Sequence, residues 1–268
     1  MSRHEDRVEA FRQLHAAGCF VMPNPWDVGS AIALEQLGFK ALATTSAGHA
    51  WMRGRADNRL LRDEALEHLR AVTGAVGLPV NADFEGGFAD DPDEVAANVK
   101  LAAATGIAGL SIEDSTGDAA DPLYAFDLAV ERVRAARRAI DETGSGVLLT
   151  GRSEGFVVGR PDLEETIRRL QAYAGAGADC LYAPGIATEQ IAEVVAAVSP
   201  KPLNLLVNAP FITVAEAASL GVRRISVGGT LARTAWGGFL EAAGEIAEAG
   251  TFSRFDGLPN VEALFSAR

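Results

Sequence analysis

The sequence predicts an α/β protein with the architecture of a TIM-type (β/α)8 barrel. Eight short β-like apolar runs alternate with longer Ala- and Leu-rich stretches, as a parallel sheet with crossover helices requires. A helical stretch, a glycine and a β-like run recur together, for example at 33–45 and 101–113. Glycine at a helix C-terminus adopts the left-handed conformation that turns the chain back toward the sheet. Eight such units in 268 residues fit one closed barrel, which typically takes about 250 residues.

The elements follow in order along the chain. Residues 4–17 form an extra amphipathic helix, with Val8, Phe11 and Leu14 on one face. The eight β-like runs predict strands at 19–24, 41–46, 79–84, 109–113, 147–152, 180–184, 202–207 and 224–228. The Ala- and Leu-rich stretches predict helices at 27–37, 60–76, 91–105, 125–143, 162–175, 188–198, 213–220 and 230–249. A doubly wound open sheet is the alternative, but it does not usually need eight evenly spaced units.

The chain is predicted to be a single domain over residues 1–268, with 230–268 as a C-terminal helical segment for oligomerisation. That segment carries Trp236, Phe239 and Leu240, followed by six more large apolar residues, which are Phe252, Phe255, Leu258, Val261, Leu264 and Phe265. This is more apolar surface than a tail beyond a closed barrel easily leaves in water, so we expect a homo-oligomer. The alternative is a tail that folds back on its own barrel.

Composition excludes several classes of partner and compartment. The net charge of −12 argues against a nucleic acid or an anionic membrane as the partner. No run approaches 18 apolar residues, and the N-terminus lacks the apolar core of a signal peptide, so we expect no membrane association. Cys19 and Cys180 have no metal-ligand spacing, which indicates a reducing, cytoplasmic compartment.

Acidic residues follow two predicted strands. Asp83 and Glu85 close one strand, and Glu113 with Asp114 closes the next. Because the carboxyl ends of barrel strands meet at one face, these carboxylates would repel each other without a cation. Oxygen-only ligands predict Mg²⁺ first and Mn²⁺ second. The alternative, solvated helix N-caps, applies to Asp114 and to the pair Asp90 and Asp91.

Other side chains at the strand ends suggest how a substrate is bound. Arg152 ends the fifth strand, where its guanidinium could bind a substrate carboxylate through two parallel N–H hydrogen bonds. Its alternative role is an ion pair with Glu154 or a neighbouring acid. Gly228 and Gly229 could cradle an anion at a helix N-terminus or simply form a tight turn. Residues 115–124 form a long polar connection, which we expect to be a mobile lid, with a disordered surface loop as the alternative.

The positions of the lysines, histidines and cysteines disfavour several kinds of catalysis. The three lysines precede strands or lie in a helix, which disfavours a Schiff base. Only His49 of four histidines follows a strand, so a multi-histidine zinc site is not expected. Neither cysteine is at a strand end, which disfavours a thiol nucleophile. Carboxylates, amides and one strand-end arginine remain, and they suit metal-assisted stabilisation of an enolate.

With these residues assembled, the chain resembles the isocitrate lyase/phosphoenolpyruvate mutase superfamily over residues 5 to 245. The resemblance implies a (β/α)8 barrel whose last helix is exchanged between subunits, usually in tetramers. It also implies Mg²⁺ and 2-oxo acid or 2-hydroxy diacid substrates, with C–C or P–C bonds made or broken beside an enolpyruvate. The motifs that carry it are Phe39 to Ser46, Arg55 to Asp57, Ala82-Asp83 with Gly86-Gly87, Ile112 to Asp114, and Gly151 to Phe156.

The resemblance also assigns roles by position. Asp83 and Glu113 match metal-shell acids, with Glu85 as a further ligand candidate, and Asp57 matches an outer-shell acid. Arg152 matches the substrate arginine. Thr45, Ser46 and Ala47 match the turn that holds the oxo acid. The predicted site is therefore Arg152, Asp57 and Thr45 for catalysis, Asp83, Glu85 and Glu113 for the metal, and Thr45, Ser46, Ala47, Arg152 and Asn208 for the substrate.

Two departures from the family pattern shape the functional hypothesis. Asn81 stands where the family has an Asp, and Glu85, where a Gly is common, would restore the lost charge. The lid 115–124 lacks the Cys, Lys and His of the lyases and the Asn of the mutase.

The leading hypothesis is a Mg²⁺-dependent lyase that acts on a small 2-oxo or 2-hydroxy dicarboxylate through a metal-stabilised enolpyruvate. Decarboxylation of an oxaloacetate-like acid fits this lid best, because CO₂ leaves without a donated proton. Methylisocitrate lyase-like C–C cleavage fits less well, because the carbanion that it releases needs a proton. The alternatives are P–C chemistry, as a mutase or a phosphonopyruvate hydrolase, and a barrel that binds a 2-oxo acid without turnover.

Overall fold

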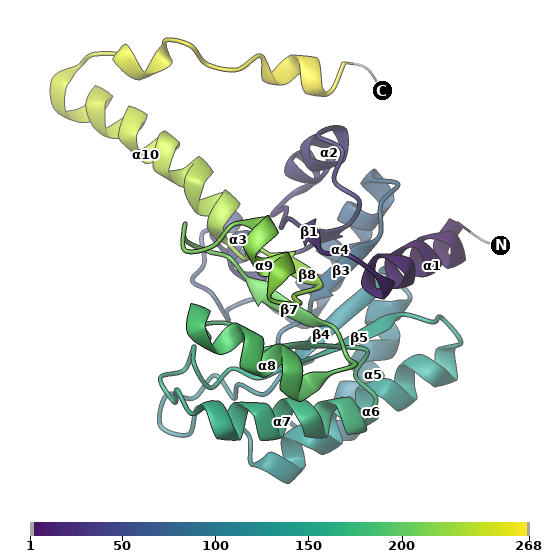
Figure 1. The fold of residues 1–268 in the computed structure, drawn as a ribbon. Helices are drawn as coiled ribbons and strands as arrows, with labels where there is room; N and C mark the ends of the chain where they lie inside the picture. The colour runs from purple at the N-terminus through teal and green to yellow at the C-terminus, as the bar shows by residue number, and fades with distance from the viewer. Residues whose placement is uncertain (1–2, 267–268) are drawn as a thin grey trace.

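Eight parallel strands surround one axis, and helices cover their outer side (Figure 1). The computed structural model describes residues 3–266. The strands pair in the order β1-β8-β7-β6-β5-β4-β3-β2. Their bounds are β1 (Phe20–Met22), β2 (Leu42–Ala43), β3 (Val80–Asp83), β4 (Gly109–Glu113), β5 (Leu148–Arg152), β6 (Cys180–Tyr182), β7 (Leu203–Leu206) and β8 (Arg224–Ser226).

The seam between β1 and β2 is closed by hydrogen bonds just beyond the two strands. The backbone N–H of Ala43 donates to the carbonyl of Pro23 at 3.1 Å. The amide of Asn24 donates to the carbonyl of Thr44 at 2.9 Å and accepts from the backbone N–H of Gly228 at 3.0 Å. These bonds tie the ends of β1, β2 and β8 together. The predicted barrel is confirmed, and the open sheet is wrong.

Helices lie where the alternation predicts them, with ends that differ by a few residues. One helix, α3, was not predicted, because it is short and directly follows β2. Thr45 is its N-cap and accepts a hydrogen bond from the backbone N–H of Gly48 at 3.2 Å. The α-helices are α1 (Arg3–Ala16), α2 (Val28–Gln36), α3 (Ser46–Met52), α4 (Arg62–Ala75), α5 (Pro92–Ala103), α6 (Phe126–Thr143), α7 (Leu163–Gly175), α8 (Ile191–Val198), α9 (Val214–Ser219) and α10 (Thr230–Ala249). Three 3-10 turns complete the set: η1 (Thr188–Gln190), η2 (Ser253–Phe255) and η3 (Val261–Leu264).

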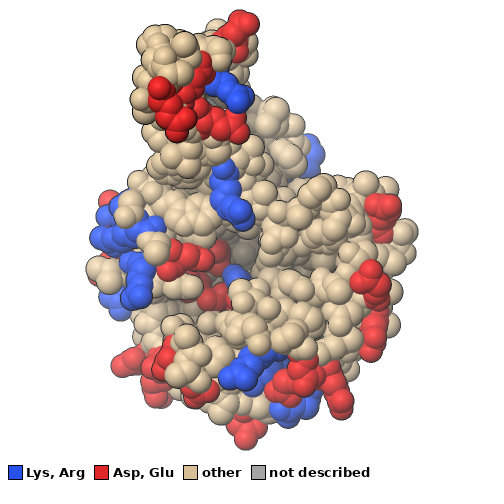
Figure 2. Space-filling view, turned by 90° about the vertical axis from the view of Figure 1, so that its left-hand side faces the viewer, with Lys and Arg blue, Asp and Glu red and all other residues tan. Residues whose placement is uncertain are grey.

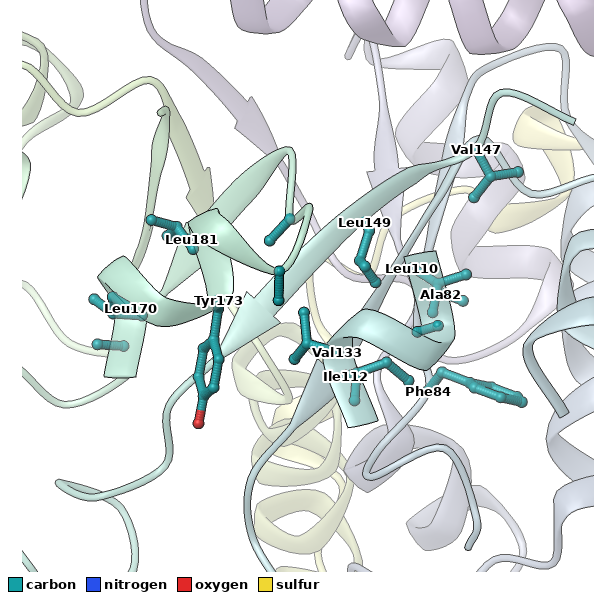
Figure 3. Close-up of a cluster of buried hydrophobic side chains, with 14 of the residues drawn as sticks. Ala82, Phe84, Leu110, Ile112, Val133, Val147, Leu149, Leu170, Tyr173 and Leu181 are labelled. Carbon is teal, nitrogen blue, oxygen red and sulfur yellow. The ribbon is translucent and has the colours of Figure 1, made fainter. Parts of the chain in front are cut away.

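The strands alternate between an apolar outer side and a polar inner side, because successive side chains of a strand point to opposite faces. On β4, Leu110 and Ile112 are buried in the main core cluster between the strands and the helices. Figure 3 shows part of this cluster, with Val133 of α6 and Leu170 of α7 packed beside residues of β4 to β6. The inward positions of the strands carry Asn81, Asp83, Ser111, Glu113, Thr150, Arg152, Tyr182, Asn204, Arg224 and Ser226.

Helix α1 packs its apolar face onto the barrel, as predicted. Phe11 is fully buried, and Val8 and Phe11 form a small core cluster with Met22, Ala43 and neighbouring residues. A Cβ atom added to Gly109, the first residue of β4, would lie 2.7 Å from the Phe11 ring. The helix therefore covers the end of the barrel at which β4 begins.

Helix α10 leads away from the barrel, and the chain after it returns above α2 (Figure 1). The side chain of Gln36, the last residue of α2, donates to the carbonyl of Leu264. The apolar side chains of Phe239 and Leu240 on α10 are 59% and 60% exposed. The exchange of this helix between subunits stays a prediction. Within residues 3–266, no helix combines the length and apolarity needed to cross a membrane.

Candidate active site

A cavity of about 250 Å³ opens at the face of the barrel where the strands end. Figure 2 shows a hollow near the centre of one face of the molecule, with acidic and basic side chains at its wall. The cavity brings together most of the predicted site, because the strand ends and the loops after them converge there. Its lining includes Thr45, Ser46, Ala47, Asp57, Asp83, Arg152 and Asn208.

Arg152 lies at the centre of an acidic cluster. Its Nη1 lies 3.1 Å from Asp83 Oδ1 and 3.1 Å from Glu113 Oε2, and its Nε donates to Glu154 Oε1. Burial alone would lower the pKa of Arg152, but the charges of these three acids raise it well above its ordinary value. The predicted ion pairs of Arg152 are thus present. Its Nη2 takes part in no hydrogen bond with residues 3–266, which leaves two N–H groups for a substrate carboxylate.

Glu113 is a buried carboxylate among other acids. It is 8% exposed, and burial raises its pKa well above the ordinary value. The charge of Arg152 opposes this shift, whereas the charges of Glu154, Asp83 and Glu85 add to it. Four carboxylates around one guanidinium leave an excess of negative charge that a divalent cation would neutralise.

Glu85 has a strained backbone and an unsatisfied carboxylate. Its φ is +49°, in the left-handed region that a non-glycine residue rarely adopts. Its Oε1 is buried and has no hydrogen-bond partner in the described chain. Burial, followed by the charges of Asp83 and Asp57, raises the pKa of Glu85 to about 8. Burial and then the charge of Asp83 likewise raise the pKa of Asp57, which lies on the loop between α3 and α4.

These acids fit a hard divalent cation in their chemistry, although they do not form a complete set of direct ligands. The unpartnered Oε1 of Glu85 and the raised pKa values of Glu85 and Glu113 fit a site that a cation would complete, because a cation would partner this oxygen and favour the ionised carboxylates. Within residues 3–266, no three His, Cys, Asp or Glu side chains are close enough to hold a metal directly. A cation here would take water molecules among its ligands, as Mg²⁺ usually does.

The hydroxyl groups of the predicted oxo-acid turn already have protein partners. Ser46 donates to Asp83 Oδ2 from its backbone N–H at 2.9 Å and from its hydroxyl at 2.8 Å. Thr45 is 2% exposed, and its hydroxyl caps α3. Both residues line the cavity, and their side chains position Asp83 and α3 in this structure.

Gly228 and Gly229 line the cavity after β8, where the chain makes a tight turn. The φ of Gly228 is +54°. A Cβ atom on Gly229 would lie 2.9 Å from the indole ring of Trp51 on α3, so only glycine fits there. The turn and this close packing account for both glycines without a bound anion.

The interpretation of Asp114 as a solvated N-cap is wrong. Asp114 is 2% exposed; its Oδ2 accepts from Tyr173 Oη at 2.6 Å and from Arg169 Nη1 at 3.1 Å. Its Oδ1 accepts from the backbone N–H of Glu154 at 2.7 Å, which joins the ends of β4 and β5. The N-cap interpretation is confirmed for Asp91, which accepts from the first two backbone N–H groups of α5 that follow Pro92.

The predicted lid, residues 115–124, is a loop with its own short bridge. Ser115 and Leu123 pair as an antiparallel bridge, and the backbone N–H of Thr116 donates to the carbonyl of Pro122 at 3.1 Å. Asp118 and Asp121 are exposed at its tip. Its closure over the cavity remains a prediction.

Two features near the cavity were missed in the sequence. His68, on α4, stacks on His49 with ring centroids 4.0 Å apart, and its buried Nε2 has no partner in the described chain. Arg224 lines the cavity from inside the barrel, beside Asn204 and Ser226. The inward alternation Arg224-Ile225-Ser226 is the signal that could have located Arg224.

Known proteins resemble this chain in fold and in sequence. The family model for phosphoenolpyruvate phosphomutase matches residues 11–247. The chain is 46% identical to a putative lyase/mutase from Burkholderia cenocepacia J2315, with a TM-score of 0.95 and 98% of each chain covered. An uncharacterized protein of Mycobacterium tuberculosis is 34% identical over 82% of this chain and 81% of its own length. The oxaloacetate decarboxylase of Rhodopseudomonas palustris strain BisB18 is 29% identical over 74% of this chain and 70% of its own length.

Proposed function

Because the chain belongs to the phosphoenolpyruvate phosphomutase family, we propose that it is a Mg²⁺-dependent carbon–carbon lyase that acts on a small 2-oxo or 2-hydroxy dicarboxylate. The observation that carries the proposal is the pairing of Arg152 with Asp83 and Glu113 beside the unsatisfied Glu85. This arrangement offers one group for a substrate carboxylate and three for a cation.

Asp83, Glu113 and Glu85 would hold Mg²⁺, partly through water, and Asp57 would lie outside them. When bound, Mg²⁺ would supply the positive charge that favours the enolate form of the product. Arg152 would bind the carboxylate of the oxo acid through Nη2, while Glu154 and Asp83 fix the plane of its guanidinium. Ser46 holds Asp83 in place with two hydrogen bonds.

Decarboxylation of an oxaloacetate-like acid agrees best with the groups present. The bond between the two carbons breaks with its electron pair left on the enolate, and CO₂ departs without accepting a proton. The enolate then takes one proton from water, on the carbon that carried the lost carboxylate, to give pyruvate. The exposed lid offers no Cys, Lys or His as a donor, and His49, on α3, is only 3% exposed. The oxaloacetate decarboxylase among the relatives agrees with this choice.

Carbon–phosphorus chemistry is the second candidate, because the family model takes its name from phosphoenolpyruvate phosphomutase. A barrel that binds a 2-oxo acid without turnover is the third.

We also propose that the protein is a cytoplasmic homotetramer. Cys19 and Cys180 are free thiols, as expected in a reducing compartment. Helix α10 leaves apolar side chains exposed, which contact with another subunit would bury.

A substrate screen separates the three candidates. Purified protein with MgCl₂ is incubated with oxaloacetate, methylisocitrate, dimethylmalate and phosphonopyruvate, and pyruvate, phosphate and phosphoenolpyruvate are measured against protein-free blanks. Pyruvate from oxaloacetate without phosphate supports the lyase. Turnover of phosphonopyruvate alone supports P–C chemistry. No product from any of the four, with binding of 2-oxo acids retained, supports the binding protein.

A further inference from the structure

Arg224 is a buried arginine inside the barrel whose hydrogen-bond partners are all neutral. It is 2% exposed. Its Nε donates to Asn204 Oδ1 at 2.8 Å, its Nη2 donates to Thr150 Oγ1 at 3.0 Å, and its Nη1 lies 3.3 Å from His15 Nε2. A guanidinium has five N–H groups, so these contacts leave two without a protein partner.

No ion pair joins Arg224 to a carboxylate within residues 3–266. Two titratable groups interact with it at the closed end of the barrel, His15 on α1 and Cys180 at the start of β6, and burial raises the pKa of the Cys180 thiol, which keeps it neutral. Burial, and then the charge of Arg224, lowers the pKa of His15 to about 3, so His15 is neutral at physiological pH. Buried charges in proteins are normally paired, and the charge of Arg224 is not.

Arg224 lines the same cavity as Arg152. Near Arg224 the cavity is lined by uncharged polar side chains: Ser226 of the same strand, Asn204 of the adjacent strand β7, and Ser111 of β4, which pairs with Thr150. The acids of the cavity, Asp57 and Asp83, lie with Arg152 where the strands end. Because no carboxylate of the described chain pairs with Arg224, its guanidinium is free to bind an anion that enters the cavity through the mouth.

The two arginines lie at different depths of the barrel. Thr150, which Arg224 contacts, precedes Arg152 by two residues on β5, or about 6.6 Å along a strand. A short diacid extended along the barrel axis would span such a step.

We propose that Arg224 forms a second anion subsite, which binds the distal carboxylate of a substrate whose 2-oxo acid end is held at the barrel mouth. This inference rests on the proposed function, because it takes the mouth as the place of the 2-oxo acid. The subsite makes the barrel selective for diacids over monoacids of equal length. It would bind a carboxylate through the two remaining N–H groups of Arg224, with Ser226 and Ser111 as neighbouring hydroxyl donors.

Calorimetric titration in MgCl₂ with 2-oxoglutarate and 2-oxopentanoate tests the subsite, because the two probes differ only in the distal carboxylate. The wild type should bind 2-oxoglutarate at least about tenfold more tightly. In Arg224→Met the preference should fall below about threefold, with 2-oxopentanoate affinity kept within about twofold. Arg223→Met is the matched control, because Arg223 is the preceding residue and donates to the Gly18 carbonyl outside the cavity. It should keep the wild-type preference.

Arg224→Met replaces an unpaired buried charge by an apolar side chain of similar length, which proteins often tolerate.

A second measurement needs no variant, because bromide is an anion that should compete for Arg224. Sodium bromide should weaken wild-type binding of 2-oxoglutarate and leave that of 2-oxopentanoate unchanged. The inference is overturned if the wild type does not prefer the diacid, if Arg224→Met keeps the preference, or if bromide affects both probes equally. If neither probe binds, the proposed function fails. An anomalous bromide peak beside Arg224 in soaked crystals then still supports the anion subsite, and its absence overturns it.

Discussion

Arg152 Nη1 lies 3.1 Å from Asp83 Oδ1, and this ion pair links the ends of β5 and β3, which are not adjacent in the sheet. Glu113, on the strand between them, lies 3.1 Å from the same nitrogen. The arginine proposed to bind the substrate thus also holds two of the acids proposed to bind the cation. Binding of the substrate and of the cation should therefore be coupled.

The variant Asp83→Ala should have no measurable turnover and an intact fold. The change removes a proposed metal ligand but also relieves the repulsion that Asp83 exerts on Glu85 and Asp57. We expect a thermal midpoint within a few degrees of the wild type, measured by circular dichroism beside a pyruvate assay. Asp63→Ala, on the surface of α4, serves as the control and should keep full activity. Full activity of Asp83→Ala would remove Asp83 from the metal site.

The stability of the metal-free protein should fall as the pH rises. The pKa of Glu85 is raised to about 8 in the folded protein, against about 4.5 when unfolded. The folded state therefore binds more protons between these values, so the free energy of unfolding decreases from about pH 4.5 to about pH 8 and then levels off. Urea titrations in EDTA at several pH values measure this slope. Glu85→Gln should flatten it, and an unchanged slope in that variant would assign the effect to another group.

The sequence predicts the barrel well because its signals are local. Glycines after helices recur in most units and apolar runs of strand length recur in all eight, so the elements and their order follow from the pattern. Helix α3 was missed because seven residues with an internal glycine carry no helical periodicity, and its cap depends on Thr45. The strand ends identified Asp83, Glu113 and Arg152 as neighbours, because parallel strands end at one face.

The partners within the site could not be predicted from the sequence. Asp114 is adjacent to Glu113, yet its side chain points outward to Arg169 and Tyr173 on α7, a contact that only the packing of helix on strand creates. Ser46 was expected to hold the substrate, but it donates both of its hydrogen bonds to Asp83. Both contacts join residues far apart in the sequence, which no local pattern records.

The lid should act by covering the substrate, without a proton donor of its own. The carboxylate of Asp118 accepts from the backbone N–H of Ala120 at 2.9 Å, and Asp121 is exposed. The variants Asp118→Ala and Asp121→Ala should each change turnover less than about tenfold, which is about 1.4 kcal/mol in the barrier. Replacement of residues 115–124 by a short Gly-Ser linker should cost far more, because solvent would reach the enolate. A loss of about 100-fold from one aspartate alone would identify it as a general acid and reopen C–C cleavage with proton transfer.

The chain should assemble into a tetramer through α10 and the segment after it. Phe239 and Leu240 are more than half exposed on a helix that leads away from the barrel, and burial against another subunit would remove this apolar area from water. Light scattering at micromolar concentration should give about four times the chain mass of 28.0 kDa. Phe239→Asp should reduce that mass, whereas Leu37→Asp, at a still more exposed apolar position just after α2, should not. A wild-type mass of 28 kDa would reject the assembly.

Removal of the metal tests the central claim most directly. The protein is stripped with EDTA, passed through a desalting column, and assayed for pyruvate release from oxaloacetate with and without MgCl₂, each rate corrected for a protein-free blank. The proposed function predicts no enzymatic rate in the stripped protein and full recovery with Mg²⁺, because Asp83, Glu85 and Glu113 cannot stabilise an enolate by themselves. Full activity in the stripped protein, with no response to Mg²⁺, would contradict the entire account of this site.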